Sequence, residues 1–426
     1  MSAGGGKQHE RGEANSVHRH GFLIVMLGVV TACGTRPPEA PAPARLVRPG
    51  IEVLLSDSLD LVRGQRVGLV SNQSGVDAAG RSDVERLLGS GIRLVALFSP
   101  EHGFRGSAEP GEAVATATDS ATGLPIYSLY GKNTAPTREM LAGLDVILVD
   151  LQDAGARYYT YVSTTIEVMR AAAREGKTVL ILDRPNPIGG EMQGNVLDTA
   201  WSSFVGRLAV PMRHGMTLGE LARLANSDLG IGARLIVAPA VGWNGSLSLD
   251  QTGLPFVPPS PNLKTLEALF HYPGLCLFEG TNLSVGRGTD APFEQVGAPW
   301  IDTTRVLARI RAAGLPGVSF RGVTFAPRHP GDGKFADTLL TGIRLTVTRR
   351  ADYDPTVTAV YLLAAIRDVH PGRFRWAAGH FDRLAGTDRL RTALEAGQTA
   401  GSATADWRTE LRTFRRRREE VLLYPR

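Results

Sequence analysis

Short apolar runs alternate with amphipathic stretches between residues 66 and 238. This alternation is typical of a parallel sheet with helices on both faces, because each strand of such a sheet is buried on both sides. The predicted strands are residues 66–72, 93–99, 125–130, 145–150, 177–183 and 234–238. The predicted helices include residues 84–88, 161–175 and 218–225, and Pro136 is expected at the first position of another. We therefore predict an α/β fold with a Rossmann-like parallel sheet.

Past about residue 302 the pattern becomes less regular. It mixes two helical stretches with a strand, at residues 303–313, 357–367 and 343–347. We predict a Rossmann-like catalytic domain over residues 51–295 and a smaller α+β auxiliary domain over residues 296–426. A cleft between two such domains is a natural place for a ligand.

The N-terminus has the pattern of an exported lipoprotein. Basic residues precede the apolar run 21–30, which is too short to span a bilayer but suits the core of a signal peptide. Val30-Thr-Ala-Cys33 resembles a bacterial lipobox, in which the cysteine becomes the lipidated first residue; an ordinary secretory signal is the alternative. We expect a signal peptide over residues 1–33, a Pro- and Ala-rich tether over 34–50, and a lipid anchor on Cys33 in the bacterial cell envelope, at the periplasm or cell surface.

The composition argues against several other classes of protein. A hydrophobic content of 43% and a charged content of 21% indicate a globular chain rather than a disordered one. The net charge of +5 is small for 426 residues, and we expect no nucleic-acid partner. The densest basic run, around Arg415 to Arg418, is interpreted as a solvated helix face. The turn Ser71-Asn-Gln-Ser-Gly75 lacks the glycine-rich pyrophosphate loop, so no dinucleotide cofactor is expected.

Polar loops follow the predicted strands at their carboxyl ends. In an open parallel sheet, ligands bind beyond these ends. The residues there that carry useful chemistry are Asn72 after the first strand, Glu101 and His102 after the second, Asp153, Arg157, Tyr158, Tyr159 and Tyr161 after residues 145–150, and Arg184 and Asn186 after residues 177–183. We expect these side chains to share one edge of the sheet.

Several motifs together resemble one family. They are Ser99-Pro-Glu-His-Gly103, Asp150-Leu-Gln-Asp-Ala-Gly-Ala-Arg-Tyr-Tyr-Thr-Tyr161, Asp183-Arg-Pro-Asn-Pro187, Pro211-Met-Arg-His-Gly-Met-Thr-Leu-Gly-Glu-Leu221, Pro259-Ser-Pro-Asn262, and Glu279-Gly-Thr-Asn282 with Gly286-Arg-Gly-Thr289. The family is that of the exo-β-N-acetylmuramidases, glycoside hydrolases long catalogued as a domain of unknown function. The resemblance covers roughly residues 51–355. It implies release of N-acetylmuramic acid from the non-reducing end of peptidoglycan fragments, in a cleft between a Rossmann-like domain and a smaller C-terminal one. Our hypothesis is an exo-acting glycosidase of cell-wall recycling that uses no cofactor or metal.

Glycoside cleavage needs a proton donor and a second group that acts as nucleophile or base. Glu101 suits the donor role, because burial behind Pro100 and Phe104 would favour the neutral form of its carboxyl group. Asp153 and Glu279 compete for the second role. Asp153 could instead pair with Arg157, or could orient the substrate's acetamido group if that group makes the attack.

Muramic acid differs from the commoner aminosugar by a lactyl carboxylate. A guanidinium binds a carboxylate with two hydrogen bonds, so Arg157, Arg184 and Arg287 are candidates for this contact. Arg287 is preferred because glycines flank it and let the backbone approach a ligand. The other candidate substrate contacts are polar or aromatic side chains, namely Asn72, His102, Tyr158, Tyr159, Tyr161, Asn186, His214 and Asn282.

Two other functions stay open at this point. Asp150, Asp153, Asp183 and His102 could hold a divalent metal for amide or phosphoester hydrolysis at the cell envelope. Alternatively, the chain could be a lipoprotein that binds the wall without catalysis. The sequence does not separate a retaining, an inverting and a substrate-assisted mechanism, because these depend on distances in space.

Overall fold

The computed structural model describes residues 47–109, 111–112 and 115–426. The expected signal peptide, the lipidated Cys33 and most of the expected tether lie outside these residues. The last residues assigned to the tether belong to the folded body, because the amide of Val47 donates to the carbonyl of Thr252 and that of Gly50 to Asp183. Among the described residues, no helix is both long and apolar enough to cross a bilayer.

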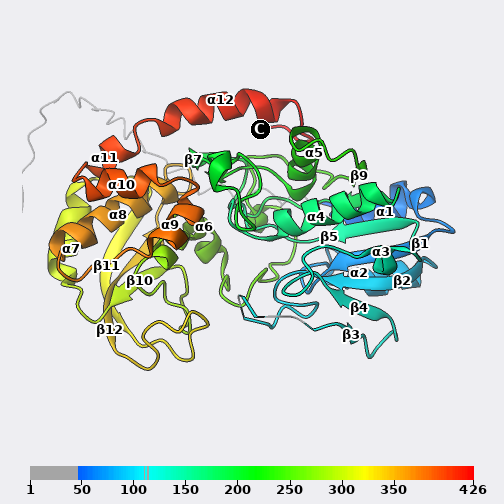
Figure 1. The fold of residues 1–426 in the computed structure, drawn as a ribbon, viewed down its shortest axis with the longest axis horizontal. Helices are drawn as coiled ribbons and strands as arrows, with labels where there is room; N and C mark the ends of the chain where they lie inside the picture. Colours follow the sequence, from blue (N-terminus) through cyan, green and yellow to red (C-terminus); the bar gives the residue numbers. More distant parts are fainter. Residues whose placement is uncertain (1–46, 110, 113–114) are drawn as a thin grey trace, which may run out of the picture. The chain divides into compact units, whose positions relative to one another are not determined.

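A seven-stranded sheet, in the order β3-β4-β2-β1-β5-β6-β9, forms the centre of the N-terminal half. Its strands are β1 (Arg66–Ser71), β2 (Arg93–Ser99), β3 (Ala117–Thr118), β4 (Pro125–Ser128), β5 (Val146–Asp150), β6 (Thr178–Leu182) and β9 (Arg234–Ala238). The strands pair in parallel except at the edge, where β3 is antiparallel to β4 (Figure 1). The Rossmann-like prediction is therefore confirmed. The strand order reverses between β1 and β5, and ligands bind at such a reversal.

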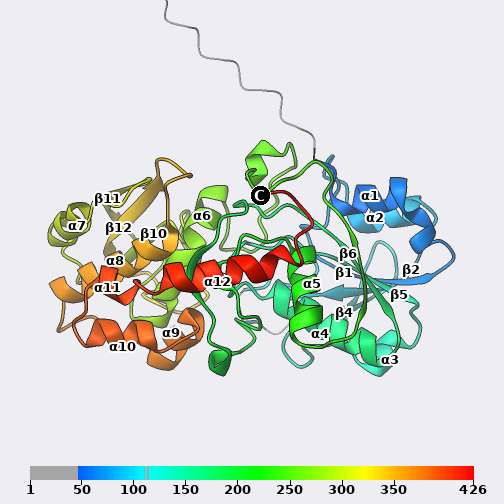
Figure 2. The same cartoon turned by 90° about the horizontal axis from the view of Figure 1, so that it is seen from above.

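Helices cover both faces of this sheet because alternate strand residues point to opposite sides. Val67, Leu69 and Leu148 face the layer of α1 (Gly50–Asp57) and α2 (Asp83–Gly89). Val70, Val149 and Ile181 face the layer of α3 (Arg138–Leu141), α4 (Tyr161–Arg174) and α5 (Leu218–Asp228). Figure 2 shows these two layers on opposite sides of the strands.

The predicted position of Pro136 is wrong. The side chain of Thr137 caps α3 by accepting a hydrogen bond from the amide of Met140, and Thr137 itself has an extended backbone. The helix therefore begins at Arg138, and Pro136 precedes the cap instead of occupying the first helical position.

The C-terminal half is built on a three-stranded antiparallel sheet in the order β10-β12-β11. These strands are β10 (Gln295–Ala298), β11 (Val318–Phe325) and β12 (Leu340–Val347). The helices around them are α6 (Leu266–Leu275), α7 (Thr303–Ala312), α8 (Pro355–Val369), α9 (Ala378–Ala385), α10 (Arg389–Glu395) and α11 (Ala400–Ala403). The smaller α+β region is thus confirmed. A two-stranded ribbon of β7 (Gln193–Val196) and β8 (Pro211–Arg213) belongs to the connecting segments.

The last helix, α12 (Trp407–Glu419), returns from the C-terminal half to the N-terminal half (red in Figure 1). Arg417 pairs with Asp228 of α5, and the buried Arg418 donates to the carbonyls of Gly190 and Gly215. The basic run is therefore not wholly a solvated face. Part of it attaches α12 to the N-terminal half.

The tail after α12 is anchored on the buried carboxylate of Asp183. Oδ2 of Asp183 accepts hydrogen bonds from the hydroxyls of Tyr424 at 2.7 Å and Thr217 at 2.6 Å. Burial raises the pKa of Asp183 to about 6, although these hydroxyl donors favour its charged form. The guanidinium of Arg426 lies 5.3 Å from the ring centroid of Trp243 and also pairs with Glu220.

Replacing Tyr424 with phenylalanine should weaken this anchor. We expect Tyr424→Phe to lower the free energy of unfolding at pH 7 by about 2 kcal/mol, because a buried carboxylate loses a donor. The lost donor stabilises the charged form, so its loss raises the pKa of Asp183 in the folded state further. The deficit should therefore be smallest below about pH 6, where Asp183 is protonated in both folded proteins, and should grow as the pH rises above about 6. Denaturant unfolding of wild type and Tyr424→Phe at several pH values measures this difference in the free energy of unfolding. Tyr361→Phe is the control, and an equal deficit in the control would contradict the role of the anchor.

Candidate active site

A cleft of about 390 Å³ opens beyond the carboxyl ends of β2 and β5, and residues of the C-terminal half close its other side. From the N-terminal half, its wall includes Glu101, His102, Tyr130, Tyr158, Tyr159 and Thr160. From the C-terminal half, it includes Tyr272, Cys276, Glu279, Arg287, Lys334 and His380. Small-molecule sites are commonly found where two lobes meet and polar groups converge.

Glu101 follows β2 and is held from two directions. Its Oε2 accepts a hydrogen bond from the hydroxyl of Thr160 at 2.6 Å, and its Oε1 accepts one from the amide of Gly111 at 3.1 Å. Thr160 is the residue that precedes α4, so a long buried helix fixes this contact. The phenol of Tyr130 lies against the same carboxyl group. Burial and the charge of Glu101 raise the pKa of Tyr130, which keeps its hydroxyl protonated as a hydrogen-bond donor.

His102 has a backbone conformation that is unusual for a residue with a side chain. Its φ is +71°, in the left-handed region, which costs on the order of 1 kcal/mol for a non-glycine residue. Its Nδ1 lies 2.8 Å from the carbonyl of Ala108, so Nδ1 must carry the hydrogen and Nε2 is left as an acceptor. Burial lowers the pKa of His102 despite the neighbouring Glu101. The ring is therefore neutral at pH 7.

Glu279 lies on the opposite wall and forms an ion pair with Arg287. Nε of Arg287 donates to Oε1 of Glu279 at 2.6 Å, and Sγ of Cys276 lies 3.4 Å from Oε2. Burial alone would raise the pKa of Glu279, but the charge and hydrogen bond of Arg287 outweigh it and lower the pKa. Glu279 is therefore an ionised carboxylate.

Lys334 fixes the loop that carries Glu279. Its ammonium group donates to the carbonyls of Glu279, Thr281 and Leu283, at 3.0, 2.8 and 3.1 Å. Burial lowers the pKa of Lys334, while the nearby carboxylates of Asp332 and Glu279 oppose this shift. All three ammonium hydrogens thus serve the backbone.

The predicted tyrosines divide between the cleft and the core. Tyr158 and Tyr159 lie in the wall, and their hydroxyls donate to the carbonyls of Pro273 and Pro259. Tyr161 is fully buried; its hydroxyl also donates to Pro259 and accepts a hydrogen bond from Asn72 at 2.6 Å. The rings of Tyr158 and Tyr159 can contact a ligand, but both hydroxyls are already engaged by backbone carbonyls, and that of Tyr158 reaches α6 of the C-terminal half.

Asp153 lies behind the cleft and not in its wall. Its Oδ2 accepts a hydrogen bond from the amide of Gly155 at 2.6 Å and lies 3.2 Å from Nε2 of His214. The amide of Met216 donates to Nδ1 of His214, so Nε2 carries the ring hydrogen and faces Asp153. The alternative pairing of Asp153 with Arg157 is therefore not found. Its observed partner is His214.

Other predicted contacts serve the backbone or the core. Arg157 is buried and donates to the carbonyls of Asn195, Val210, Leu384 and Ala385. Arg184 pairs with Asp150, the amide of Asn186 donates to the carbonyl of Met216, and Asn282 bonds the backbone of Arg373 and Arg375. Of the three candidate arginines, Arg287 is the one that the structure brings into the cleft wall.

The residues considered for a metal site are not brought together. Asp150 pairs with Arg184, Asp153 faces His214, and Asp183 accepts from Thr217 and Tyr424. Within residues 47–109, 111–112 and 115–426, no group of three or more His, Cys, Asp and Glu side chains is placed to hold a metal ion.

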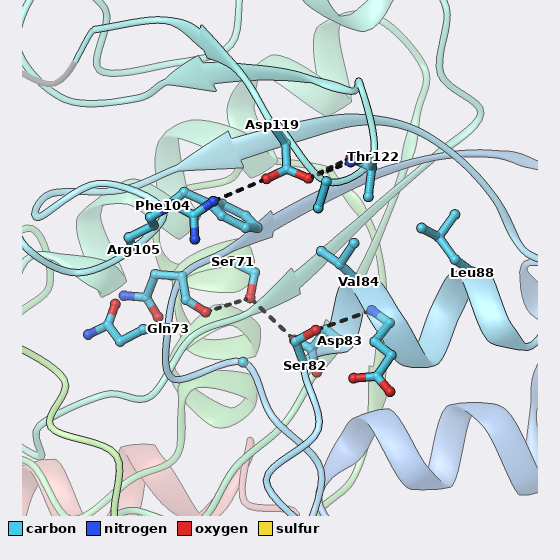
Figure 3. A pocket seen from close by; sticks show the side chains of 14 residues that line it. Ser71, Gln73, Ser82, Asp83, Val84, Leu88, Phe104, Arg105, Asp119 and Thr122 are labelled. Carbon is cyan, nitrogen blue, oxygen red and sulfur yellow. Dashed lines mark hydrogen bonds and ion pairs between the residues drawn. The ribbon is translucent and has the colours of Figure 1, made fainter.

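A neighbouring pocket of about 450 Å³ is lined in part by the loop that follows β2 (Figure 3). Glu101 and His102 line the cleft, whereas Phe104 and Arg105 of the same loop line this pocket. Its polar contacts include the ion pair of Arg105 and Asp119 at 3.6 Å, the hydrogen bond of Thr122 to Asp119 at 2.7 Å and that of Ser71 to Asp83 at 3.2 Å. It also contains Asn72, but neither Glu101 nor Glu279 is in its wall.

The sequence prediction missed several residues of the cleft. Thr160 stands inside the quoted motif that ends at Tyr161, so the signal for it was present but was assigned to the tyrosines. Lys334 and His380 come from the C-terminal half, where the sequence pattern is irregular and offered no comparable signal. Tyr130 follows the short strand β4, whose polar end was not considered.

Comparisons with known proteins identify the family of the chain. Residues 67–267 match the family model described as exo-β-N-acetylmuramidase NamZ, N-terminal, and residues 270–424 match its C-terminal counterpart. The peptidoglycan β-N-acetylmuramidase NamZ of Bacillus subtilis (strain 168) is 40% identical over 406 residues, which cover 94% of this chain and 97% of that protein.

Solved structures extend the likeness to the fold. A DUF1343 family protein from Bacteroides fragilis NCTC 9343 superposes with a TM-score of 0.82 at 32% identity, covering 90% of this chain and all of that one. A second DUF1343 protein of the same organism gives a TM-score of 0.71 at 32% identity, covering 89% of this chain and 99% of that one. The chain belongs to the exo-β-N-acetylmuramidase (NamZ) family.

Proposed function

We propose that the protein releases N-acetylmuramic acid from the non-reducing end of peptidoglycan fragments and that this reaction takes place in the Glu101 cleft. Membership of the family makes the chain a glycoside hydrolase of peptidoglycan turnover. One observation carries the location of the chemistry: Glu101 and Glu279, from opposite halves of the chain, line the same cleft. Two carboxyl groups that flank the scissile bond are what glycoside hydrolysis requires.

Glu101 is assigned as the proton donor to the glycosidic oxygen. The hydroxyl of Thr160 and the amide of Gly111 fix the plane of its carboxyl group, which keeps the transferred proton aimed at one point. The neighbouring phenol of Tyr130 can donate a hydrogen bond once Glu101 has given up its proton. The neutral His102 beside it can accept one from a sugar hydroxyl through Nε2.

Glu279 is assigned the second role. It is ionised beside Arg287, so it can stabilise the positive charge that develops at the anomeric carbon. In this role it either attacks that carbon or removes a proton from the attacking water, and the anomer of the released sugar distinguishes the two. Asp153 faces His214 behind the cleft and is assigned a positioning role.

Arg287 is assigned to recognise the lactyl carboxylate of muramic acid. Within the described chain, its hydrogen bond to Glu279 engages Nε, and no hydrogen bond engages its two terminal nitrogens. The ring centroid of Phe293 lies 5.0 Å from the guanidinium carbon of Arg287, so the ring packs against one side of the group. The substrate's carboxylate can therefore bind Arg287 without displacing Glu279.

We also propose that the protein acts outside the cytoplasm, attached to the cell envelope through a lipid on Cys33. The support is the short apolar run followed by Val30-Thr-Ala-Cys33. An envelope location places the enzyme beside the polymer from which its substrates come.

The carboxyl assignments predict a clear order of activities. Glu101→Gln and Glu279→Gln should each lower kcat for the β-linked disaccharide of N-acetylmuramic acid and N-acetylglucosamine by about a hundredfold or more, because each removes a group that acts in the transition state and the sugar leaving group needs the proton. Asp153→Asn should lower kcat less than either glutamate variant does, and should lower the melting temperature more. Steady-state kinetics and thermal unfolding measure both, with the exposed Glu139→Gln as control. Full activity in Glu101→Gln would contradict the assignment of Glu101 as the proton donor.

The assignment of Arg287 predicts a change in substrate preference. Arg287→Lys keeps the positive charge beside Glu279 but loses the planar two-point contact. We expect KM for the muramic-acid glycoside to rise about tenfold. The inhibition constant of the matching N-acetylglucosamine glycoside, which lacks the lactyl group and is tested as a competitive inhibitor, should change little. Equal changes for both glycosides would show that Arg287 acts through Glu279 alone.

The proposed lipid anchor predicts where the protein is found after cell fractionation. Wild type should sediment with the membranes, and Cys33→Ser should not, because it lacks the acylated sulfur. Cys276→Ser is the matched control, since that buried cysteine lies in the folded body. Membrane association that survives Cys33→Ser would contradict the anchor.

A further inference from the structure

Two apolar residues, Phe204 and Val205, occupy the tip of a tight turn in the segment between β7 and β8. Ser203 and Gly206 close this turn through two backbone hydrogen bonds, of 3.0 and 3.1 Å. Gly, Asn, Asp, Ser and Pro are the usual residues of such tips, because they suit the backbone of a turn. The two apolar residues instead line the catalytic cleft. The catalytic and binding assignments above give them no role.

The ring of Phe204 is only partly buried and does not belong to the hydrophobic core. Val205 packs against the main core, whereas none of the apolar clusters found in the described part of the chain includes Phe204. Its aromatic neighbour is Tyr130, with ring centroids 6.1 Å apart and ring planes tilted by 56°. The guanidinium carbon of Arg207 lies 5.9 Å from the ring centroid of Phe204. An aromatic ring that lines a cleft without packing in the core is available to a ligand.

Helix α4 fixes the position of this turn. The hydroxyl of Ser163, in the first turn of α4, donates to the carbonyl of Phe204 at 2.6 Å. Ser163 comes three residues after the threonine whose hydroxyl holds Glu101. Arg207 pairs with Glu167, further along the same helix, at 3.3 Å. The start of α4 therefore positions both the proton donor and the turn that carries Phe204.

The chemistry of the reaction decides which sugar lies beside Phe204. The proton donor Glu101 must reach the oxygen that joins muramic acid to the next sugar, so the leaving sugar lies beside Glu101. Tyr130 lies against Glu101 and also against Phe204. Arg287, which is assigned to the lactyl group, instead contacts Glu279 on the opposite wall. The side of the cleft formed by Tyr130 and Phe204 is therefore the side of the leaving sugar.

We propose that Phe204 and Tyr130 form the binding site of the leaving sugar, the N-acetylglucosamine residue that follows muramic acid in the glycan. The proposal rests on the proposed function, because it concerns the second sugar of the same substrate. One face of a β-linked N-acetylglucosamine ring consists of C–H groups, and such a face packs against an aromatic ring. Removing both apolar surfaces from water contributes to binding. The site therefore favours a sugar over a small alcohol as the leaving group.

Kinetics with the β-linked disaccharide of N-acetylmuramic acid and N-acetylglucosamine test this site. We expect Phe204→Ala to lower kcat/KM for the disaccharide about tenfold, because the leaving sugar loses its ring contact. The inhibition constant of free N-acetylmuramic acid should stay unchanged, since that sugar binds beside Arg287. Phe204→Tyr should restore most of the loss, whereas Phe204→Leu, which keeps bulk without a flat ring, should not. Phe325→Ala removes a half-buried ring of β11 outside the cleft and should leave both constants unchanged.

Binding without turnover separates this proposal from the proposed function. With Glu101→Gln and the intact disaccharide, saturation-transfer NMR should show contact at the ring protons of N-acetylglucosamine. Adding Phe204→Ala should abolish that signal and leave the signal of the muramic-acid protons.

Three results would overturn the leaving-sugar site. They are unchanged kinetics in Phe204→Ala, equal NMR losses at both sugars, and a rise in the inhibition constant of N-acetylmuramic acid that matches the loss on the disaccharide. The last two would show that Phe204 only shapes the cleft. If wild type cleaves no disaccharide while the NMR signals behave as expected, the proposed hydrolysis fails and the sugar site stands.

Discussion

A buried ion pair between Asp150 and Arg184 holds together the edge of the sheet on which the site depends. Nη2 of Arg184 donates to Asp150 at 3.0 Å and to the carbonyl of Val76 at 2.7 Å, so one guanidinium joins the loops that follow β1, β5 and β6. Asp83 lies 3.9 Å away. Burial and repulsion from Asp150 raise the pKa of Asp83 well above the ordinary value. The cluster therefore holds a neutral acid beside one compensated ion pair, which is tolerable in an interior where unpaired charges are not.

The catalytic cleft is assembled from this rigid edge and from the C-terminal half. Glu101 is fixed by Thr160 at the start of α4, and Glu279 by Arg287 and by the loop that Lys334 ties together. Side chains from one half also bond the backbone of the other: Arg157 donates to the carbonyls of Leu384 and Ala385. The relative position of the two carboxyl groups thus depends on contacts far from either. A substitution at such a contact should affect kcat as well as stability.

Much of the fold and part of the site could be predicted from the sequence. The apolar strands and the polar loops after them indicated the Rossmann-like sheet and its active edge, because both follow from short-range patterns. The cleft contains Glu101, His102, Tyr158, Tyr159, Glu279 and Arg287 from the predicted set. Their catalytic and binding roles remain predictions. The C-terminal helices after residue 377 and the α12 anchor were not predicted in any detail.

The remaining site residues could not be sorted from the sequence for a physical reason. Arg157, Arg184 and Arg287 are alike as residues, and only their partners decide what each does. Arg157 meets carbonyls more than two hundred residues away, Arg184 meets Asp150 in the core, and Arg287 meets Glu279 in the cleft. Asp153 and Glu279 are both acidic residues of polar loops, and only the structure shows that Asp153 faces His214 whereas Glu279 lines the cleft. Long-range pairing of this kind leaves no local pattern in the chain.

The central claim is that this cleft removes muramic acid from the non-reducing end of a glycan. The most direct test incubates the protein with two β-linked disaccharides, one with N-acetylmuramic acid and the other with N-acetylglucosamine at the non-reducing end, and identifies the free sugars by mass spectrometry. The account predicts that only the first disaccharide is split, releasing N-acetylmuramic acid. Cleavage of neither disaccharide, or of the second as readily as the first, would contradict it.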